Sequence, residues 1–200
     1  KDRDNPEVMA YLKSENAYTD TVMAHTGDLQ EKLFLEMKGR IKEEDQSVPQ
    51  IDNGYLYYNR TEKDKQYPIY CRKKGNVSAP EEVLFDVNKM AEGTQAYIMA
   101  NYEITPDNKL AAYSFNTTGS SAEFNLKIRN LENGEDLPYE ISNVQSFVWA
   151  NDNKTLFYTR SSETFRPYRV YRHQINSKMP DELLFEEKDE MFNLYVGKSK

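Results

Sequence analysis

The chain of 200 residues contains few of the residues that define common metal and redox sites. Its single cysteine, Cys71, excludes an internal disulfide bond and a cysteine-rich zinc site. Its two histidines, His25 and His173, lie far apart in the sequence and have no clustered carboxylates beside them. This spacing matches no metal-binding pattern. We therefore expect no metal and no cofactor in this chain.

Basic residues are fewer than acidic ones: the chain has 26 lysines and arginines, 33 aspartates and glutamates, and a net charge of −7. Binding to nucleic acid or to an anionic membrane surface requires a basic excess, so we expect neither partner. No apolar run approaches the ~18 residues of a membrane-spanning helix. Aromatic residues make up 12% of the chain and can bury large areas, which argues against disorder. The sequence predicts a soluble, acidic, globular protein.

Residues 4–45 have the pattern of a helical hairpin. Asn5 can cap the first helix, which begins with a proline. Apolar residues recur with a period near 3.6 on both sides of a central break. Asp28 and Glu31 have the spacing of a capping box for the second helix. We assign residues 1–48 to this helical segment.

From residue 49 onward, short runs rich in tyrosine, phenylalanine, isoleucine and valine alternate with turn residues, without a long helix between them. Strands of this length and spacing indicate an antiparallel all-β architecture. The predicted strands are 54–58, 67–72, 83–87, 97–102, 110–115, 124–128, 147–150, 155–159, 168–172, 183–185 and 192–196.

A repeat within this region indicates which β architecture it forms. The repeated turn-and-strand segments are 53–58, 106–113 and 151–158. After each of them come a second strand and, beyond an acidic turn, a third; the predicted third strands are 82–85, 136–139 and 182–185. Four-stranded units that recur every ~40–50 residues are typical of β-propeller blades. A β-sandwich with accidental internal similarity is the alternative.

The number of blades indicates an incomplete propeller. Residues 49–200 hold about three blades, with the strand predicted at 192–196 in a fourth position. Propellers close with ~4–8 blades, and three blades leave open sheet edges. We therefore predict a mainly β chain in which residues 49–200 form the first blades of a partial propeller. On this interpretation the chain is the front part of a longer protein.

Within the chain itself, no residue has the pattern of a catalytic group. The Gly-x-Ser-x-Gly pentapeptide that carries the nucleophile of α/β-hydrolases does not occur. His25 lies at the helix break, where an interaction with a helix C-terminus explains it. His173 lies at the end of a predicted strand. Cys71 occupies an alternating position of another predicted strand, where we expect it to act as a small hydrophobic residue. We predict no catalytic, cofactor-binding or metal-binding residue in these 200 positions.

Several stretches nevertheless resemble one known family. They are residues 5–18, 22–26, 29–31 and 39–42 in the helical segment, and 67–72, 81–84, 91–93 and 166–173 in the β region. Together they resemble the oligopeptidase B (protease II) branch of the prolyl oligopeptidase family of serine peptidases. The Arg-Pro-Tyr-Arg-Val-Tyr-Arg-His run at 166–173 favours this branch over the prolyl-specific one.

The resemblance implies a serine peptidase in which a seven-bladed propeller covers an α/β-hydrolase domain and excludes large proteins. Such enzymes cleave short peptides after lysine or arginine with a Ser-His-Asp triad. All triad positions would fall beyond residue 200, so the segment alone is expected to be inactive. The apolar stripes of the helical hairpin would pack on the hydrolase domain.

The expected partners are therefore short basic oligopeptides, the hydrolase domain and the remaining blades of the same chain. A non-catalytic propeller that binds a peptide or a protein is the alternative function. The two differ in the sequence expected after residue 200: further blades and then a Gly-x-Ser-x-Gly pentapeptide for the peptidase, further blades alone for the binding protein. The single cysteine suits a reducing cytoplasm without excluding the periplasm, and we predict a cytoplasmic protein.

Overall fold

A computed structural model describes residues 4–177 and 179–199. The chain separates into two compact units, Lys1–Glu43 and Glu44–Lys200. The first unit is helical and the second consists mainly of β-strands. In the described residues no helix has both the length and the apolar character needed to cross a membrane.

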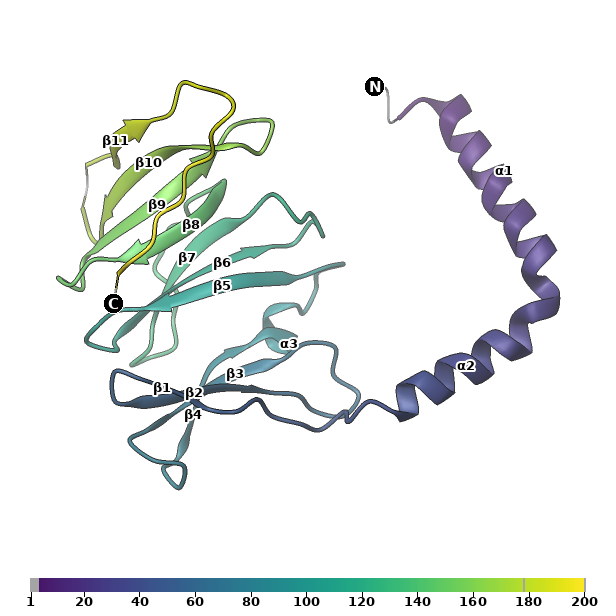
Figure 1. Cartoon of the computed structure of the whole chain (residues 1–200), viewed down its shortest axis with the longest axis horizontal. Helices are drawn as coiled ribbons and strands as arrows, with labels where there is room; N and C mark the ends of the chain where they lie inside the picture. The colour runs from purple at the N-terminus through teal and green to yellow at the C-terminus, as the bar shows by residue number, and fades with distance from the viewer. Residues whose placement is uncertain (1–3, 178, 200) are drawn as a thin grey trace. The chain divides into compact units, whose positions relative to one another are not determined.

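The helical unit consists of α1 (Pro6–Met23), a 3-10 turn (Ala24–Thr26) and α2 (Gly27–Gly39). The two helices of the predicted hairpin are present and meet at an open bend (Figure 1). The cap predicted at Asn5 is confirmed, because its side-chain oxygen accepts a 2.9 Å hydrogen bond from the backbone N–H of Glu7. This bond satisfies one of the free N–H groups at the start of α1.

The capping box predicted at Asp28 and Glu31 is wrong. Helix α2 begins one residue before Asp28, and Thr26 occupies the N-cap position without a capping hydrogen bond from its side chain. The Thr26 hydroxyl instead donates to the Met23 carbonyl oxygen at 2.7 Å and accepts from Gln30. The 3-10 turn continues the helical backbone into α2, so Asp28 already lies inside the first turn.

Both helices expose their apolar residues. Neither α1 nor α2 contains a buried residue. The exposed large apolar side chains are Val8, Met9, Tyr11, Leu12, Tyr18, Val22, Met23, Leu29, Leu33, Phe34, Leu35 and Met37. Because helix stability in proteins comes mainly from packing of an apolar face, this unit has little tertiary stabilisation of its own.

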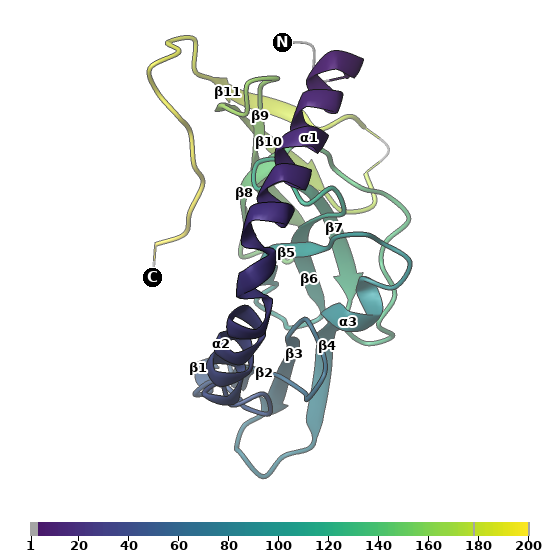
Figure 2. The ribbon, with the colours of Figure 1, turned by 90° about the vertical axis from the view of Figure 1, so that its right-hand side faces the viewer.

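The β unit contains three antiparallel sheets that succeed one another along the chain (Figures 1 and 2). The first sheet consists of β1 (Gln50–Asp52), β2 (Tyr55–Arg60), β3 (Ile69–Lys74) and β4 (Glu81–Asp86). The second consists of β5 (Ile98–Ile104), β6 (Leu110–Asn116) and β7 (Asn125–Asn130). The third consists of β8 (Val144–Trp149), β9 (Thr155–Ser161), β10 (Pro167–Gln174) and β11 (Glu182–Glu186). A short helix, α3 (Val87–Met90), comes directly after β4.

This arrangement confirms the predicted partial propeller. Strands adjacent in the sequence pair within each sheet, and the first ten predicted strands each overlap an observed one. Strand β1 was not predicted, because its three residues are all exposed and carry no alternating pattern.

The hydrophobic core lies between the sheets. Phe85 of the first sheet packs with Tyr113 of the second, and Leu126 of the second sheet belongs to a cluster with Tyr158 of the third. The middle sheet is therefore covered on both faces. This explains why six consecutive residues of β6 are buried, where a strand with one solvated face would alternate.

Two predicted strands are absent from the described residues. Residues 136–139 form no regular strand: Leu137 N–H donates to the Ile128 carbonyl oxygen at 2.7 Å, but the next residue, Pro138, has no N–H to donate. This segment runs beside β7 through isolated bridges only, including Arg129 with Asp136.

The second wrong prediction is the strand at 192–196. Leu194 N–H bonds to the Pro167 carbonyl oxygen at 2.8 Å, and Val196 N–H bonds to the Ser146 hydroxyl at 3.0 Å. These two bonds go to different strands, so no ladder forms. A strand requires a continuous partner edge, and the described residues offer this segment none.

Candidate functional site

The first strands of the three sheets, β1, β5 and β8, border a hollow of about 710 Å³. Residues 196–199 near the end of the chain complete its lining. Its charged and amide side chains are Asp52, Asn53, Asn101, Glu103, Asn108, Gln145, Asn151 and Lys198. A hollow of this volume lies within the range of ~300–1,000 Å³ that small ligands occupy.

Glu103, on β5, is the half-buried carboxylate of this hollow. Burial raises the pKa of its carboxyl group, and the nearby charge of Asp52 raises it further. The ammonium group of Lys198 acts in the opposite direction. Within the described residues, the Glu103 side chain forms neither a hydrogen bond nor an ion pair. Its backbone carbonyl oxygen accepts a 2.9 Å hydrogen bond from the indole N–H of Trp149, which holds β5 against the third sheet.

Lys198 places a positive charge in the same hollow. Its ammonium group donates a hydrogen bond to the side-chain carbonyl oxygen of Asn151. The tail that carries it is held to β8 by the bond between Val196 N–H and the Ser146 hydroxyl. The hollow therefore contains two carboxylates, amide acceptors and one cation.

Three asparagines in equivalent turns join the sheets at one end of the hollow. Asn53, Asn108 and Asn153 each come directly after an aspartate between the first two strands of a sheet, with φ values of 44°, 63° and 60°. Asparagine tolerates this left-handed conformation better than most residues. The Asn153 side chain accepts from Asp107 N–H at 2.9 Å, and the Asn108 side chain donates to the Asn53 carbonyl oxygen at 3.3 Å. The repeated turns that the sequence revealed thus connect neighbouring sheets.

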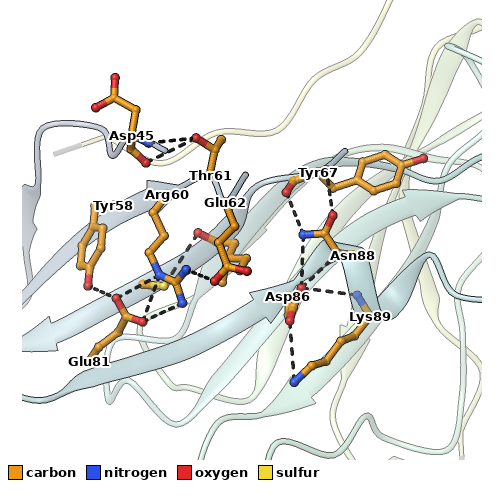
Figure 3. A network of polar contacts seen from close by, with 12 residues as sticks. Asp45, Tyr58, Arg60, Thr61, Glu62, Tyr67, Glu81, Asp86, Asn88 and Lys89 are labelled. Carbon is orange, nitrogen blue, oxygen red and sulfur yellow. Dashed lines mark hydrogen bonds and ion pairs between the residues drawn. The ribbon is translucent and has the colours of Figure 1, made fainter. Parts of the chain in front are cut away.

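A second polar cluster lies in the first sheet (Figure 3). Tyr58 and Arg60 of β2 both reach Glu81 of β4, with the tyrosine hydroxyl 2.5 Å and the guanidinium 3.1 Å from its oxygens. Burial alone would raise the pKa of the Glu81 carboxyl, but the Tyr58 hydrogen bond and the Arg60 charge lower it below its ordinary value. Arg60 also pairs with Glu62.

Cys71 is fully buried in β3 beside this cluster. Burial, together with the negative charge of Glu81, raises the pKa of its thiol to about 11. The thiol is therefore protonated at neutral pH. This agrees with the small hydrophobic role predicted for Cys71 and not with a reactive nucleophile.

His173 lies inside β10 and is buried. Its Nδ1 is 2.7 Å from Asp181 Oδ1, and its Nε2 is 3.0 Å from the Tyr139 hydroxyl. In the neutral imidazole, a hydrogen on Nδ1 donates to Asp181 and leaves Nε2 to accept from the Tyr139 hydroxyl. Burial raises the pKa of that tyrosine to about 12. His173 thus joins the third sheet to the segment after β7, a link that its sequence neighbours do not reveal.

His25 has the role predicted for it. Its Nδ1 is 2.9 Å from the carbonyl oxygen of Val22 at the end of α1. The sequence did not predict this hollow. Glu103 belongs to no sequence motif, and its place beside Asp52 and Lys198 follows only from the packing of β1, β5 and β8 around the hollow.

Three stacked antiparallel meanders, whose first strands border a common hollow, define a partial β-propeller. Comparison with known families agrees with this class: residues 1–200 match the family described as the prolyl oligopeptidase N-terminal β-propeller domain. The chain belongs to this family.

Individual relatives are similar over nearly the whole chain. It is 37% identical to dipeptidyl aminopeptidase BI of Pseudoxanthomonas mexicana over 99% of its length and 35% identical to Protease 2 of Moraxella lacunata over 100%. It spans 30% of the length of each. The solved structure of oligopeptidase B from Leishmania major matches 96% of this chain with 28% of its own, at 30% identity and a TM-score of 0.87.

Proposed function

We propose that this chain is the N-terminal part of a serine peptidase that cleaves short peptides after lysine or arginine. The propeller would restrict access to small substrates. One observation carries the proposal: the family match covers all 200 residues, and the likeness to an oligopeptidase B extends over both the helical and the β unit. Because the chain spans about 30% of its curated relatives, the bond-making residues belong to the rest of the protein.

Several features support a preference for basic substrates. The names Protease 2 and oligopeptidase B belong to relatives of the branch that the sequence resembles. The net charge of −7 favours long-range attraction of cationic peptides. The hollow at β1, β5 and β8 also carries more negative than positive side chains.

The chain's own contribution would be steric and architectural. The exposed apolar faces of α1 and α2 are suited to burial against a hydrolase domain, where they would gain the packing they lack here. The sheets, joined by apolar clusters and by the asparagine turns, would form a wall of the propeller.

A second activity is favoured by one relative. The protein with 37% identity is named a dipeptidyl aminopeptidase, and such an enzyme requires a free amino terminus two residues before the cleaved bond. A dipeptidyl aminopeptidase would therefore not cleave a substrate whose amino terminus is blocked, whereas the proposed peptidase would.

The test uses the full-length protein with two fluorogenic substrates, a benzyloxycarbonyl-blocked arginyl aminomethylcoumarin and an unblocked dipeptidyl aminomethylcoumarin that ends in arginine. Turnover of the blocked substrate, sensitive to a serine-directed phosphonate, supports the proposal. Turnover of the unblocked substrate alone supports the dipeptidyl activity instead. Equal cleavage of a folded lysine-rich protein would contradict the steric role of the propeller.

The 200-residue chain is the matched negative control. We expect it to leave the arginyl substrate intact, because it carries no assigned catalytic residue. Turnover by this chain that resists trypsin inhibitors would contradict the expectation.

A further inference from the structure

The Glu103 carboxylate differs from the other partly buried acidic groups of the β unit. Each of these has a partner: Glu62 pairs with Arg60, Asp86 with Lys89 and Glu186 with Arg169, Asp181 is hydrogen-bonded to His173, and Glu187 accepts from the backbone N–H of Asp189. Glu103 has no such partner within the described residues, although it is half-buried. Burying a charge without a partner costs free energy, so the position is unfavourable for folding alone.

The surroundings of Glu103 are suited to a cation. The hollow holds about 710 Å³, and Asp52 adds a second negative charge to it. Further acceptors come from Asn101 on β5, Gln145 on β8 and Asn151 in the turn after β8. An ammonium or guanidinium group entering this space would meet both charge and hydrogen-bond acceptors.

The chain itself shows that a cation fits. The Lys198 ammonium group lies in the hollow, bonds to Asn151 and interacts electrostatically with Glu103 without forming an ion pair with it. The carboxylate is thus left available to a second cation, and the lysine would compete with it by like-charge repulsion.

We propose that the hollow between β1, β5 and β8 is a binding site for a basic side chain of a peptide, with the Glu103 carboxylate as its principal anion. The identity of the ligand as a peptide rests on the proposed function, whereas the preference for a cation rests on the hollow itself. The residues that line the hollow all belong to this chain.

The experiment is an isothermal titration of the full-length protein after treatment with an irreversible phosphonate analogue of arginine, which would fill a serine active site. The probe is the tripeptide acetyl-Ala-Arg-Ala-amide. Its matched control is the same peptide with citrulline, which keeps the shape of arginine but carries no charge. We expect binding of the arginine peptide that weakens with salt and weaker binding of the citrulline peptide.

Three variants make the test specific to the hollow. Glu103→Gln should weaken binding of the arginine peptide about tenfold, because it removes the anion but keeps the shape. Lys198→Met should tighten binding about threefold, because it removes the competing cation. Glu163→Gln, at an exposed loop position, should bind like the unmodified protein. Thermal unfolding controls for folding: Glu103→Gln should be at least as stable, since it removes an unpaired charge, whereas a purely structural role predicts a lower melting temperature.

Unchanged affinity in Glu103→Gln, or equal binding of the citrulline peptide, would overturn the proposal. Weaker binding in Lys198→Met would also overturn it, because the lysine would then be part of the site and not a competitor. Failure of the proposed function looks different: no substrate is cleaved, yet the arginine peptide still binds in a Glu103-dependent manner.

Discussion

The hydroxyl group of Tyr158 donates a 2.8 Å hydrogen bond to Asp181, which lies 23 residues later in the chain. The same separation of 23 residues joins Tyr58 to Glu81 and Tyr113 to Asp136. In each sheet a buried tyrosine of the second strand thus binds a carboxylate near the outer edge. Each copy of the sequence repeat therefore contains the same hydrogen bond between a buried tyrosine and a carboxylate.

Replacing Tyr158 by phenylalanine should lower the free energy of unfolding by about 2 kcal/mol, because a hydrogen bond to a charged group is lost at a buried position. Urea unfolding of the 200-residue chain measures this, with Trp149, its only tryptophan, as the fluorescent reporter. Tyr195→Phe is the control, since Tyr195 is 69% exposed and should change the stability by less than about 0.5 kcal/mol. An equal loss in both variants would contradict the role of the Tyr158–Asp181 bond.

The two histidines should differ strongly in their effect on stability. His173→Ala leaves Asp181 and Tyr139 without their shared partner and should cost about 2–3 kcal/mol. His25→Ala, at an exposed helix end, should cost less than about 1 kcal/mol. A double-mutant cycle of His173→Ala with Tyr139→Phe, measured by urea unfolding, should show a coupling of about 1 kcal/mol. Full additivity would mean that the bond does not stabilise the connection between the sheets.

The Tyr58–Arg60–Glu81 cluster should make stability depend on acid pH. The folded state lowers the pKa of Glu81, so the stabilisation is present above the pKa of the unfolded glutamate and is lost as the pH falls through the folded value. The difference in free energy of unfolding between the parent chain and Glu81→Gln should therefore be largest near pH 6 and shrink toward pH 3. Urea titrations at several pH values measure it. Glu163→Gln should show no such trend; a difference that grew on acidification would contradict the assigned shift.

Substitutions at Asn153 should separate its conformation from its hydrogen bond. Asn153→Gly keeps the positive φ but removes the acceptor for Asp107 N–H, and should cost about 1 kcal/mol. Asn153→Ala loses the bond and adds strain in the left-handed region, for about 1 kcal/mol more. Asn153→Asp, which keeps the acceptor, should be the mildest of the three. Urea unfolding measures the free energy of unfolding of the three variants. An alanine variant as stable as the glycine variant would contradict the backbone strain predicted for alanine at this position.

Local patterns predicted the individual elements well. The Asn5 cap, ten of the strands and the repeated Asp-Asn turns depend on residues close together in the sequence, whose preferences are intrinsic. The wrong predictions concern segments whose structure depends on one particular residue or on the segment that lies beside them. Pro138 removes a ladder donor from an otherwise strand-like segment. Asp28 does not cap α2, because the helix begins at Gly27 and Asp28 already lies in its first turn. The segment at 192–196 has β-forming side chains but no continuous strand beside it.

The sequence by itself determined the class of this protein: its repeat length, aromatic strands and family-specific stretches identify a partial propeller of the prolyl oligopeptidase family. It also determined ten of the strands and their grouping into sheets, because pairing here is between neighbours in the chain. Only the tertiary structure decided which side chains meet across sheets. Lys198 lies far from Glu103 in the sequence, as His173 does from Tyr139, and both the electrostatic interaction of the first pair and the hydrogen bond of the second depend on how the sheets stack. Such stacking depends on the summed packing of many apolar side chains, and no local motif records it.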